Sequence, residues 1–473
     1  MQRTNRLQTL FFLSLLLAAV SLTPGCTALP MRSQQVWRSA TNHAYPSEAI
    51  GSEAFEAALD CYTESAAHDG ISAKLLQNGD EAYPVMLELI ASAKTRISFE
   101  TYIIEKDETT DVFFAALRDA AARGVEVRFL ADAVGFHRGM LAHLDELNKT
   151  GVQARIFNPL FLSWTILRGN NRDHRKILVV DGQHAVLGGI NLSDVQRGDG
   201  VSGWRDTALL VSGRTAADAE QVFAETWEQA GRAWLGRSLP LTILNPPKRL
   251  LDAPFQALWR QTCVYVPFLP PAHGMTEPGR CGLDPDTYDT HNASVRVVSS
   301  SPDKRNSPTY DMAILGVLGA RERIDIACAY FVPPLNLKRA LLAAAARGVQ
   351  VRLLLPGVTD VKWVREIGMK SYGELLAAGA RIYEWPHVIL HAKTMAVDGK
   401  WLVVGSANMD SRSYFLNYEA CLVASDQALA EKAHAQFEAD LLHAPELTLE
   451  EWLARSTRQK ALETLLTPVA GQY

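Results

Sequence analysis

The feature that most constrains how this chain folds is an internal repeat. The letters AARGVEVR at 121–128 return as AARGVQVR at 345–352, and RIF at 155–157 returns as RIY at 381–383. Self-similarity of this kind indicates that one supersecondary architecture occurs twice in the chain. We therefore expect two related halves.

Helical and strand patterns alternate within each half. Helical stretches are expected at 83–94, 110–123 and 334–347, and short apolar strand-like runs at 97–104, 125–131, 323–331 and 349–355. A β-α-β-α order is typical of a mostly parallel or mixed sheet with helices on its faces. The predicted fold class is α/β, with two halves that each form such a sheet.

The composition is that of a folded protein with more than one domain. Of the 473 residues, 48% are hydrophobic and 21% are charged, which is typical of soluble globular chains. The formal net charge is -5, so no global basic field would draw a nucleic acid to the surface. No nucleic-acid partner is expected, and any recognition of a phosphate must be local.

The first residues have the pattern of an export signal. An apolar run at 10–20 is shorter than the ~20 residues that span a bilayer. It is followed by Gly25-Cys26, which resembles a bacterial lipoprotein cleavage site, although Thr23 stands where such sites usually carry Leu. We expect a signal peptide at 1–25, a lipidated Cys26, and export to the bacterial cell envelope with the folded part in the periplasm. An uncleaved anchor and an ordinary secretory signal are the alternatives.

Composition and the repeat together suggest the remaining boundaries. The expected segments are a tether and linker at 26–70, a first half at 71–238, a Pro- and aromatic-rich connector at 239–292, a second half at 293–443 and a C-terminal tail at 444–473. The connector is too apolar for a flexible linker. A packed connector and a lid over a functional site both remain open for it.

The cysteines do not predict a metal site. Cys328 and Cys421 lie in apolar strand-like runs and are expected to be small buried residues. Cys263 and Cys281 share the Pro-rich segment, and a disulfide between them is left open. Because no Cys-x2-Cys pair occurs, a zinc site is not expected, and no cofactor is expected either.

The strongest signal is a motif that occurs once near the end of each half. It reads His174-x-Lys176-x4-Asp181 in the first half and His391-x-Lys393-x4-Asp398 in the second. A His and a Lys two positions apart on a strand point to the same face. The aspartate then enters a tight turn, and an apolar return strand brings Asn191 or Asn408 back beside them.

Two copies of this motif favour a catalytic pair, whereas a single histidine would more often be structural. Two lysines and two asparagine amides would neutralise a phosphodiester oxyanion without a metal. One histidine would attack phosphorus and form a phosphohistidine, while the other would protonate the departing alcohol and then deprotonate the acceptor.

These motifs resemble those of the phospholipase D superfamily, and the resemblance covers about 71–443. It implies that the halves meet about a pseudo-twofold axis, so that both motifs face one active-site cleft. It also implies that His174 is the nucleophile and His391 the acid/base, an assignment that the residues alone leave open to exchange.

The same resemblance assigns the acidic residues. Asp206 and Glu419 stand at similar distances downstream of the two motifs and resemble the acids that orient the histidines. Asp181 and Asp398 would mainly brace their turns. The roles of Arg172 and Arg175 are open, since as neighbours of His174 they would either add positive charge for a phosphate or be surface residues with no role.

Details within the motifs are similar to bacterial cardiolipin synthases. The pattern is Asn408-x-Asp410-x-Arg412-Ser413-x3-Asn417-x-Glu419. It implies a metal-independent phosphatidyl transferase that makes cardiolipin from phosphatidylglycerol at a membrane surface. The apolar segment 160–167 would line an acyl-chain groove or be part of the core. The alternatives are a phospholipid hydrolase, a nuclease and a non-catalytic lipid-binding lipoprotein, and no protein partner is identifiable.

Overall fold

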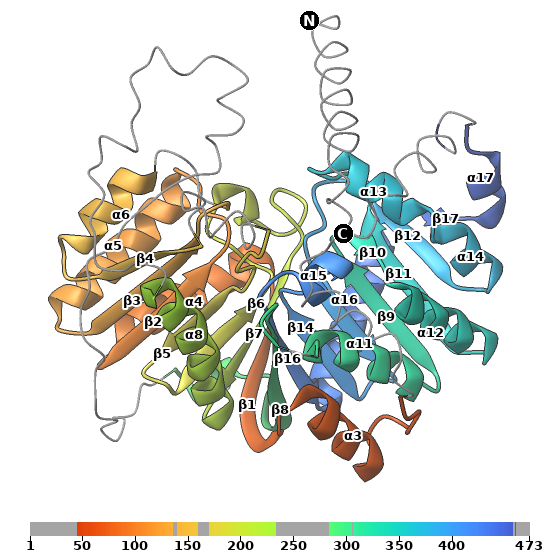
Figure 1. Ribbon diagram of the computed structural model, residues 1–473, viewed down its shortest axis with the longest axis horizontal. Helices are drawn as coiled ribbons and strands as arrows, with labels where there is room; N and C mark the ends of the chain where they lie inside the picture. The colour runs from red at the N-terminus through yellow and green to blue at the C-terminus, as the bar shows by residue number, and fades with distance from the viewer. Residues whose placement is uncertain are drawn as a thin grey trace, which may run out of the picture.

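The computed structural model describes residues 45–135, 140–158, 170–232, 283–304 and 306–456, together with Gln459. Its centre is one 15-stranded sheet that runs through both halves of the chain (Figure 1). From the middle outward, the first half contributes β1 (His68–Gln77), β7 (Thr207–Ser212), β6 (His184–Gly188), β5 (Ile177–Val180), β2 (Arg96–Thr101), β3 (Glu126–Asp132) and β4 (Gln153–Phe157). The second half contributes β8 (Thr290–Ser300), β16 (Glu419–Ser425), β14 (Trp401–Gly405), β13 (Lys393–Val397), β9 (Arg323–Cys328), β11 (Gln350–Pro356), β12 (Arg381–Trp385) and β17 (Glu446–Leu447).

The strand order confirms the predicted duplication. β1 and β8 pair antiparallel at the seam, and the elements of the two halves then follow outward in the same sequence on either side. β17 is an addition at the edge of the second half, and β10 (Phe331–Val332) and β15 (Met409–Asp410) form a separate small sheet. Two α/β halves are therefore related by an approximate twofold axis at the seam.

The sheet is mixed, and parallel pairing is confined to β2, β3 and β4 and to their counterparts β9, β11 and β12. The prediction of a mostly parallel or mixed sheet is confirmed in its mixed form, with the parallel part in these strands. They are linked by helices, which a parallel crossover requires. The strands that carry the motifs, β5 and β13, instead form hairpins with β6 and β14, so the inner part of each half is antiparallel.

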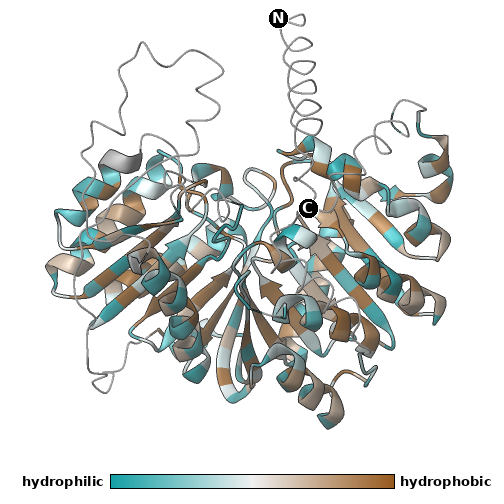
Figure 2. Ribbon diagram, viewed as in Figure 1, coloured by the Kyte–Doolittle hydropathy of each residue, from teal (hydrophilic) through white to brown (hydrophobic). Residues whose placement is uncertain are grey.

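Helices cover both faces of the sheet. The helices are α3 (Glu53–Thr63), α4 (Asn78–Ser92), α5 (Glu108–Ala122), α6 (Met140–Asn148), α8 (Arg214–Arg232), α11 (Pro308–Gly319), α12 (Leu335–Ala346), α13 (Lys362–Met369), α14 (Tyr372–Ala377), α15 (Ser411–Phe415), α16 (Gln427–Leu441) and α17 (Leu449–Ala454), with short 3-10 turns η1 (Asp194–Gln196) and η3 (Pro285–Thr287). Because side chains alternate along β5, Leu178 packs toward α4 and α5, whereas Val179 packs toward α8 and α16. Figure 2 shows the strands as the most hydrophobic elements between these layers.

Two segments outside the predicted halves are folded. α3 lies in the region expected to be a linker, where Ser52 Oγ accepts a hydrogen bond from Phe55 N at 3.1 Å and caps the helix. Phe55 and Leu59 are buried against α11. Near the C-terminus, Trp452 of α17 packs on Tyr372 of α14 with 5.6 Å between ring centroids. Both segments add to the core of the second half.

Several predictions fall outside the described residues, namely those for 1–25, Cys26, 160–167, Cys263, Cys281 and most of the connector. Cys328 and Cys421 are buried, unpaired residues of the strands, as predicted. In the ranges that are described, no helix combines the length and the apolar character needed to cross a bilayer.

Candidate active site

The two motifs lie where the inner strands of each half begin. His174 and Lys176 directly precede β5, and in the second half His391 precedes β13, which begins at Lys393. All four side chains are buried. The return strands β6 and β14 end just before Asn191 and Asn408, so each half delivers a histidine, a lysine and an asparagine to the same edge of the sheet.

Backbone hydrogen bonds join each motif to the opposite half. His174 N donates to Tyr418 O at 3.0 Å, and Tyr418 N donates to Arg172 O at 2.8 Å. In the twofold-related position, His391 N donates to Arg205 O at 2.7 Å, and Arg205 N donates to Ile389 O at 3.0 Å. Tyr418 and Arg205 each precede an orienting acid, so these bonds bring that acid to the other half's histidine.

The acids are therefore exchanged between the halves. His174 Nδ1 lies 3.1 Å from both carboxylate oxygens of Glu419. His391 Nδ1 lies 2.6 Å from Asp206 Oδ2. A carboxylate at Nδ1 fixes the ring orientation and leaves Nε2 as the nitrogen available for chemistry.

Burial sets the charge state of this site. It lowers the pKa of His174 to about 4 against the opposing effect of Glu419, and it lowers the pKa of His391 with help from Lys393. Although burial opposes ionisation of Glu419, the nearby His174 and Lys176 hold its pKa below the ordinary value. Both histidines are thus neutral near pH 7, as a nucleophile requires.

Each lysine contacts the backbone of the histidine in its own motif. Lys176 Nζ donates to His174 O, and Lys393 Nζ donates to His391 O. Burial, with the charge of Lys393 nearby, lowers the pKa of Lys176 to about 7, and burial lowers the pKa of Lys393 as well. Burial of two cations is costly even with Glu419 and Asp206 nearby, and an anionic phosphate beside the lysines would offset that cost.

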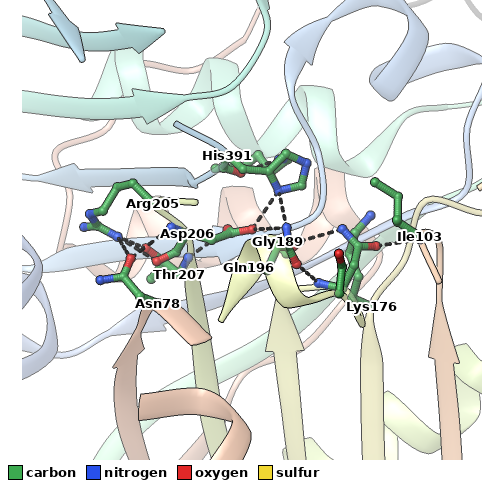
Figure 3. Close-up of polar contacts among 12 residues, drawn as sticks. Asn78, Ile103, Lys176, Gly189, Gln196, Arg205, Asp206, Thr207 and His391 are labelled. Atoms are coloured by element: carbon green, nitrogen blue, oxygen red, sulfur yellow. Dashed lines mark hydrogen bonds and ion pairs between the residues drawn. The ribbon is translucent and has the colours of Figure 1, made fainter. Parts of the chain in front are cut away.

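The two asparagines differ in their hydrogen bonding. Asn191 Oδ1 accepts from Ile103 N at 2.8 Å (Figure 3). Asn408 Oδ1 is buried and has no hydrogen-bond partner within the described ranges. The twofold relation between the halves is therefore approximate at the level of single bonds.

Three further polar residues contact the orienting acids, and one of them, Asn417, belongs to the pattern that follows Asn408 in the sequence. Ser406 Oγ donates to Glu419 Oε2 at 2.5 Å, and Asn417 Nδ2 donates to Glu419 Oε1 at 3.2 Å. Gln196 Nε2 donates to Asp206 Oδ2 at 3.2 Å. The repeat itself points to Ser406, because the two halves differ at this position. The matching residue is Gly189, and a Cβ added there would lie 2.1 Å from Asp206 Oδ1. No sequence pattern marks Gln196.

The motif aspartates lie outside the site. Asp181 Oδ1 accepts from Thr95 N at 2.7 Å and from Arg96 N at 2.9 Å. Asp398 Oδ1 accepts from Glu322 N at 2.9 Å and from Arg323 N at 2.8 Å. Each therefore ties the motif hairpin to the start of the neighbouring strand, at the end of the hairpin away from the histidine.

The two arginines beside His174 are buried, so their interpretation as surface residues was wrong. Arg172 Nη1 pairs with Asp132 Oδ1 at 3.3 Å, and Arg175 Nη1 donates to Val222 O at 2.9 Å. Burial raises the pKa of the neighbouring Asp173 to about 7. These side chains form an ionic layer beneath His174.

Aromatic rings flank both histidines. Tyr102 packs edge-on against His174 with 5.0 Å between ring centroids, and Trp204 lies 5.2 Å from His391. Among the residues that the structure describes, no cluster of three or more His, Cys, Asp or Glu side chains has the arrangement of a metal site.

Comparisons with known proteins point to one family. A family model described as the cardiolipin synthase, PLD-like domain matches residues 86–227 and 317–441. Cardiolipin synthase 1 of Bacillus anthracis is 30% identical over 403 residues, which are 85% of this chain and 72% of that protein. The cardiolipin synthase of Geobacillus thermodenitrificans is 31% identical over 402 residues, which are 84% and 72% of the two chains.

A solved structure supports the fold alone. The phosphatidylserine synthase of Haemophilus influenzae aligns with a TM-score of 0.58 at 14% identity and covers 93% of this chain and 97% of its own. The family model matches each half over its motif hairpin, and the aligned curated relatives span both halves. The chain belongs to the phospholipase D-like cardiolipin synthase family.

Proposed function

We propose that this protein is a phosphatidyl transferase that makes cardiolipin from two molecules of phosphatidylglycerol. The observation that carries the proposal is the exchange of acids between the halves, which presents two buried His-carboxylate pairs with two lysines in one site. The curated relatives named cardiolipin synthase supply the substrate class.

The first chemical step transfers the phosphatidyl group to the protein. Nε2 of His174 attacks phosphorus, the bond from phosphorus to the glycerol oxygen breaks, and His391 donates the proton that the departing glycerol needs. For this step His391 takes up a proton when the anionic substrate binds, since the added negative charge raises the pKa of nearby bases.

The second step passes the group to a lipid alcohol. His391, now neutral, removes the proton from the glycerol hydroxyl of a second phosphatidylglycerol, and that oxygen attacks phosphorus while the bond to His174 breaks. Lys176, Lys393, Asn191 and Asn408 stabilise the negative oxygens in both steps. This mechanism uses no metal.

Transfer competes with hydrolysis, because water attacks a phosphohistidine as readily as an alcohol does when it can enter the site. Deep burial of His174 and His391 favours the transfer reaction, since water is limited there. A lipid anchor at Cys26 would hold the site at the membrane and increase the local concentration of the acceptor. Cys26 and the signal peptide remain predictions from the sequence.

The test is the product formed from phosphatidylglycerol vesicles by the purified protein in the presence of EDTA. We expect cardiolipin and free glycerol in equal amounts, with phosphatidic acid as a minor product. Phosphatidic acid as the sole lipid product at every lipid density would identify a hydrolase. Turnover that is lost in EDTA and restored by a divalent ion would contradict the metal-independent mechanism.

A further inference from the structure

Gln196 lies at the point where the phosphate-binding and proton-transfer parts of the site meet (Figure 3). It ends the short turn η1 and is 1% exposed. Its Oε1 accepts a hydrogen bond from the backbone N of Asn191, and its Nε2 donates to Asp206 Oδ2 at 3.2 Å. The same carboxylate oxygen lies 2.6 Å from His391 Nδ1.

We propose that Gln196 is a positioning residue that weakens the attraction of the Asp206 carboxylate for the protonated ring of His391 and fixes Asp206 relative to Asn191. The inference deepens the proposed function, in which His391 moves the proton. Gln196 touches no reacting atom in this scheme and acts through Asp206.

The donor and acceptor roles of these groups indicate how Gln196 acts. Its Nε2 is also 3.3 Å from His391 Nδ1, but Nδ1 carries a hydrogen when it donates to Asp206, and two donors cannot bond to each other. Asp206 Oδ2 is therefore the shared acceptor. A second donor on that oxygen draws charge away from the carboxylate and weakens its attraction for the imidazolium.

In the second half, two residues make the two hydrogen bonds that Gln196 makes in the first half. The counterpart of Gln196 is Ser413, whose Oγ accepts from Asn408 N at 3.1 Å. The amide donor to Glu419 comes instead from Asn417, at 3.2 Å. The chain itself thus offers a substitution taken from its other half, since Gln196→Ser removes the amide donor to Asp206.

Other charges near His391 are the same in every variant. The ionisable groups that face His391 are Asp206, Lys393 and Lys176, and Thr207 N holds the other oxygen of Asp206 at 2.8 Å. A change at Gln196 therefore alters one donor to Asp206 and leaves these contacts in place.

The test is an NMR titration of the histidine rings in the full-length protein, with His391 assigned by its loss in His391→Ala. We expect His391 in Gln196→Ser to titrate roughly 0.5 to 1 pH unit higher than in the wild type. His174 should not move. Gln196→Glu, which keeps Oε1 and adds a negative charge beside Asp206, should move His391 further in the same direction. The exposed Gln350→Ser serves as the control.

Activity provides a second measurement. With phosphatidylglycerol, kcat of Gln196→Ser should fall about tenfold at unchanged KM. An unchanged or lower titration midpoint for His391 in both Gln196 variants would overturn the inference. Because the titration needs no substrate, it separates this outcome from failure of the proposed function, which would appear as wild-type protein that does not turn over phosphatidylglycerol.

Discussion

At the scale of single residues, the two histidines share their backbone geometry but not their surroundings. His174 stands between Asp173 and Arg175, above a buried ionic layer that includes Glu100. Burial and the neighbouring Asp173 raise the pKa of Glu100 well above its ordinary value. His391 stands between Leu390 and Ala392, which pack in an apolar cluster. The ionic surroundings of His174 and the apolar surroundings of His391 are consistent with different roles for the two histidines in the proposed mechanism.

The roles can be separated with a donor whose leaving group needs no proton. With phosphatidyl-p-nitrophenol, His391→Ala should release about one equivalent of nitrophenolate per site in a burst and retain a covalent phosphatidyl label, because attack by His174 is intact and the second step is not. His174→Ala should give neither signal. Absorbance and protein-bound label measure the two events, and the reverse pattern would make His391 the nucleophile.

Sequence reasoning found the residues of the site but not how they pair. His-x-Lys spacing and duplication predicted both motifs, and the resemblance to the phospholipase D superfamily predicted both acids. The exchange of acids was not predictable, because His174 and Glu419 are 245 residues apart and His391 and Asp206 are 185 apart. Only the tertiary arrangement of the seam determines which acid meets which ring.

At the scale of elements, the turn conformation and the position of each motif hairpin depend on its aspartate. Asp181 adopts φ 54° and Asp398 adopts φ 53°, a backbone region that disfavours most side chains. Asp181 also accepts hydrogen bonds from the backbone N–H groups of Lys94, Thr95 and Arg96. Asp181 therefore joins β5 to the start of β2 and fixes the position of the whole hairpin.

This placement predicts a stability effect and little effect on chemistry. Asp181→Ala should lower the free energy of unfolding by about 2 to 3 kcal/mol, since it removes several acceptors and places alanine in the left-handed region. Asp181→Asn should cost less because asparagine tolerates that region and keeps one oxygen. Urea unfolding measures the difference, and kcat per folded molecule should stay near wild type. A loss of kcat without a loss of stability would indicate that Asp181 has a catalytic role.

Element positions and the two motif hairpins were largely predictable, whereas the antiparallel β1–β8 seam was not. The helices expected at 110–123 and 334–347 match α5 and α12 to within two residues at each end. The turn residues after each motif strand predicted the hairpins at Asp181 and Asp398. Periodicity alone does not reveal which strands pair across the seam. α3 was missed because its single buried face is short, although Ser52 is a recognisable N-cap.

At the scale of the whole molecule, the halves form a single folding unit. One buried cluster includes residues of β1, β7, α8, β8, β16 and α16, and so belongs to both halves. Arg205 of the first half pairs with Asp440 of the second at 2.9 Å, and both are buried. Neither half holds a complete site, because each histidine depends on an acid from the other.

A complete site should therefore form within one chain and not between two. If so, an equimolar mixture of His174→Ala and His391→Ala chains, unfolded and refolded together, should be as inactive as each variant alone, because every chain carries one defective histidine. An exchange of halves between two chains would produce sites with both histidines intact and restore up to about a quarter of wild-type activity, as random pairing requires. The continuous β1–β8 seam and the buried Arg205–Asp440 pair oppose such an exchange. Transfer activity of the refolded mixture, measured beside refolded wild type, decides between the two arrangements.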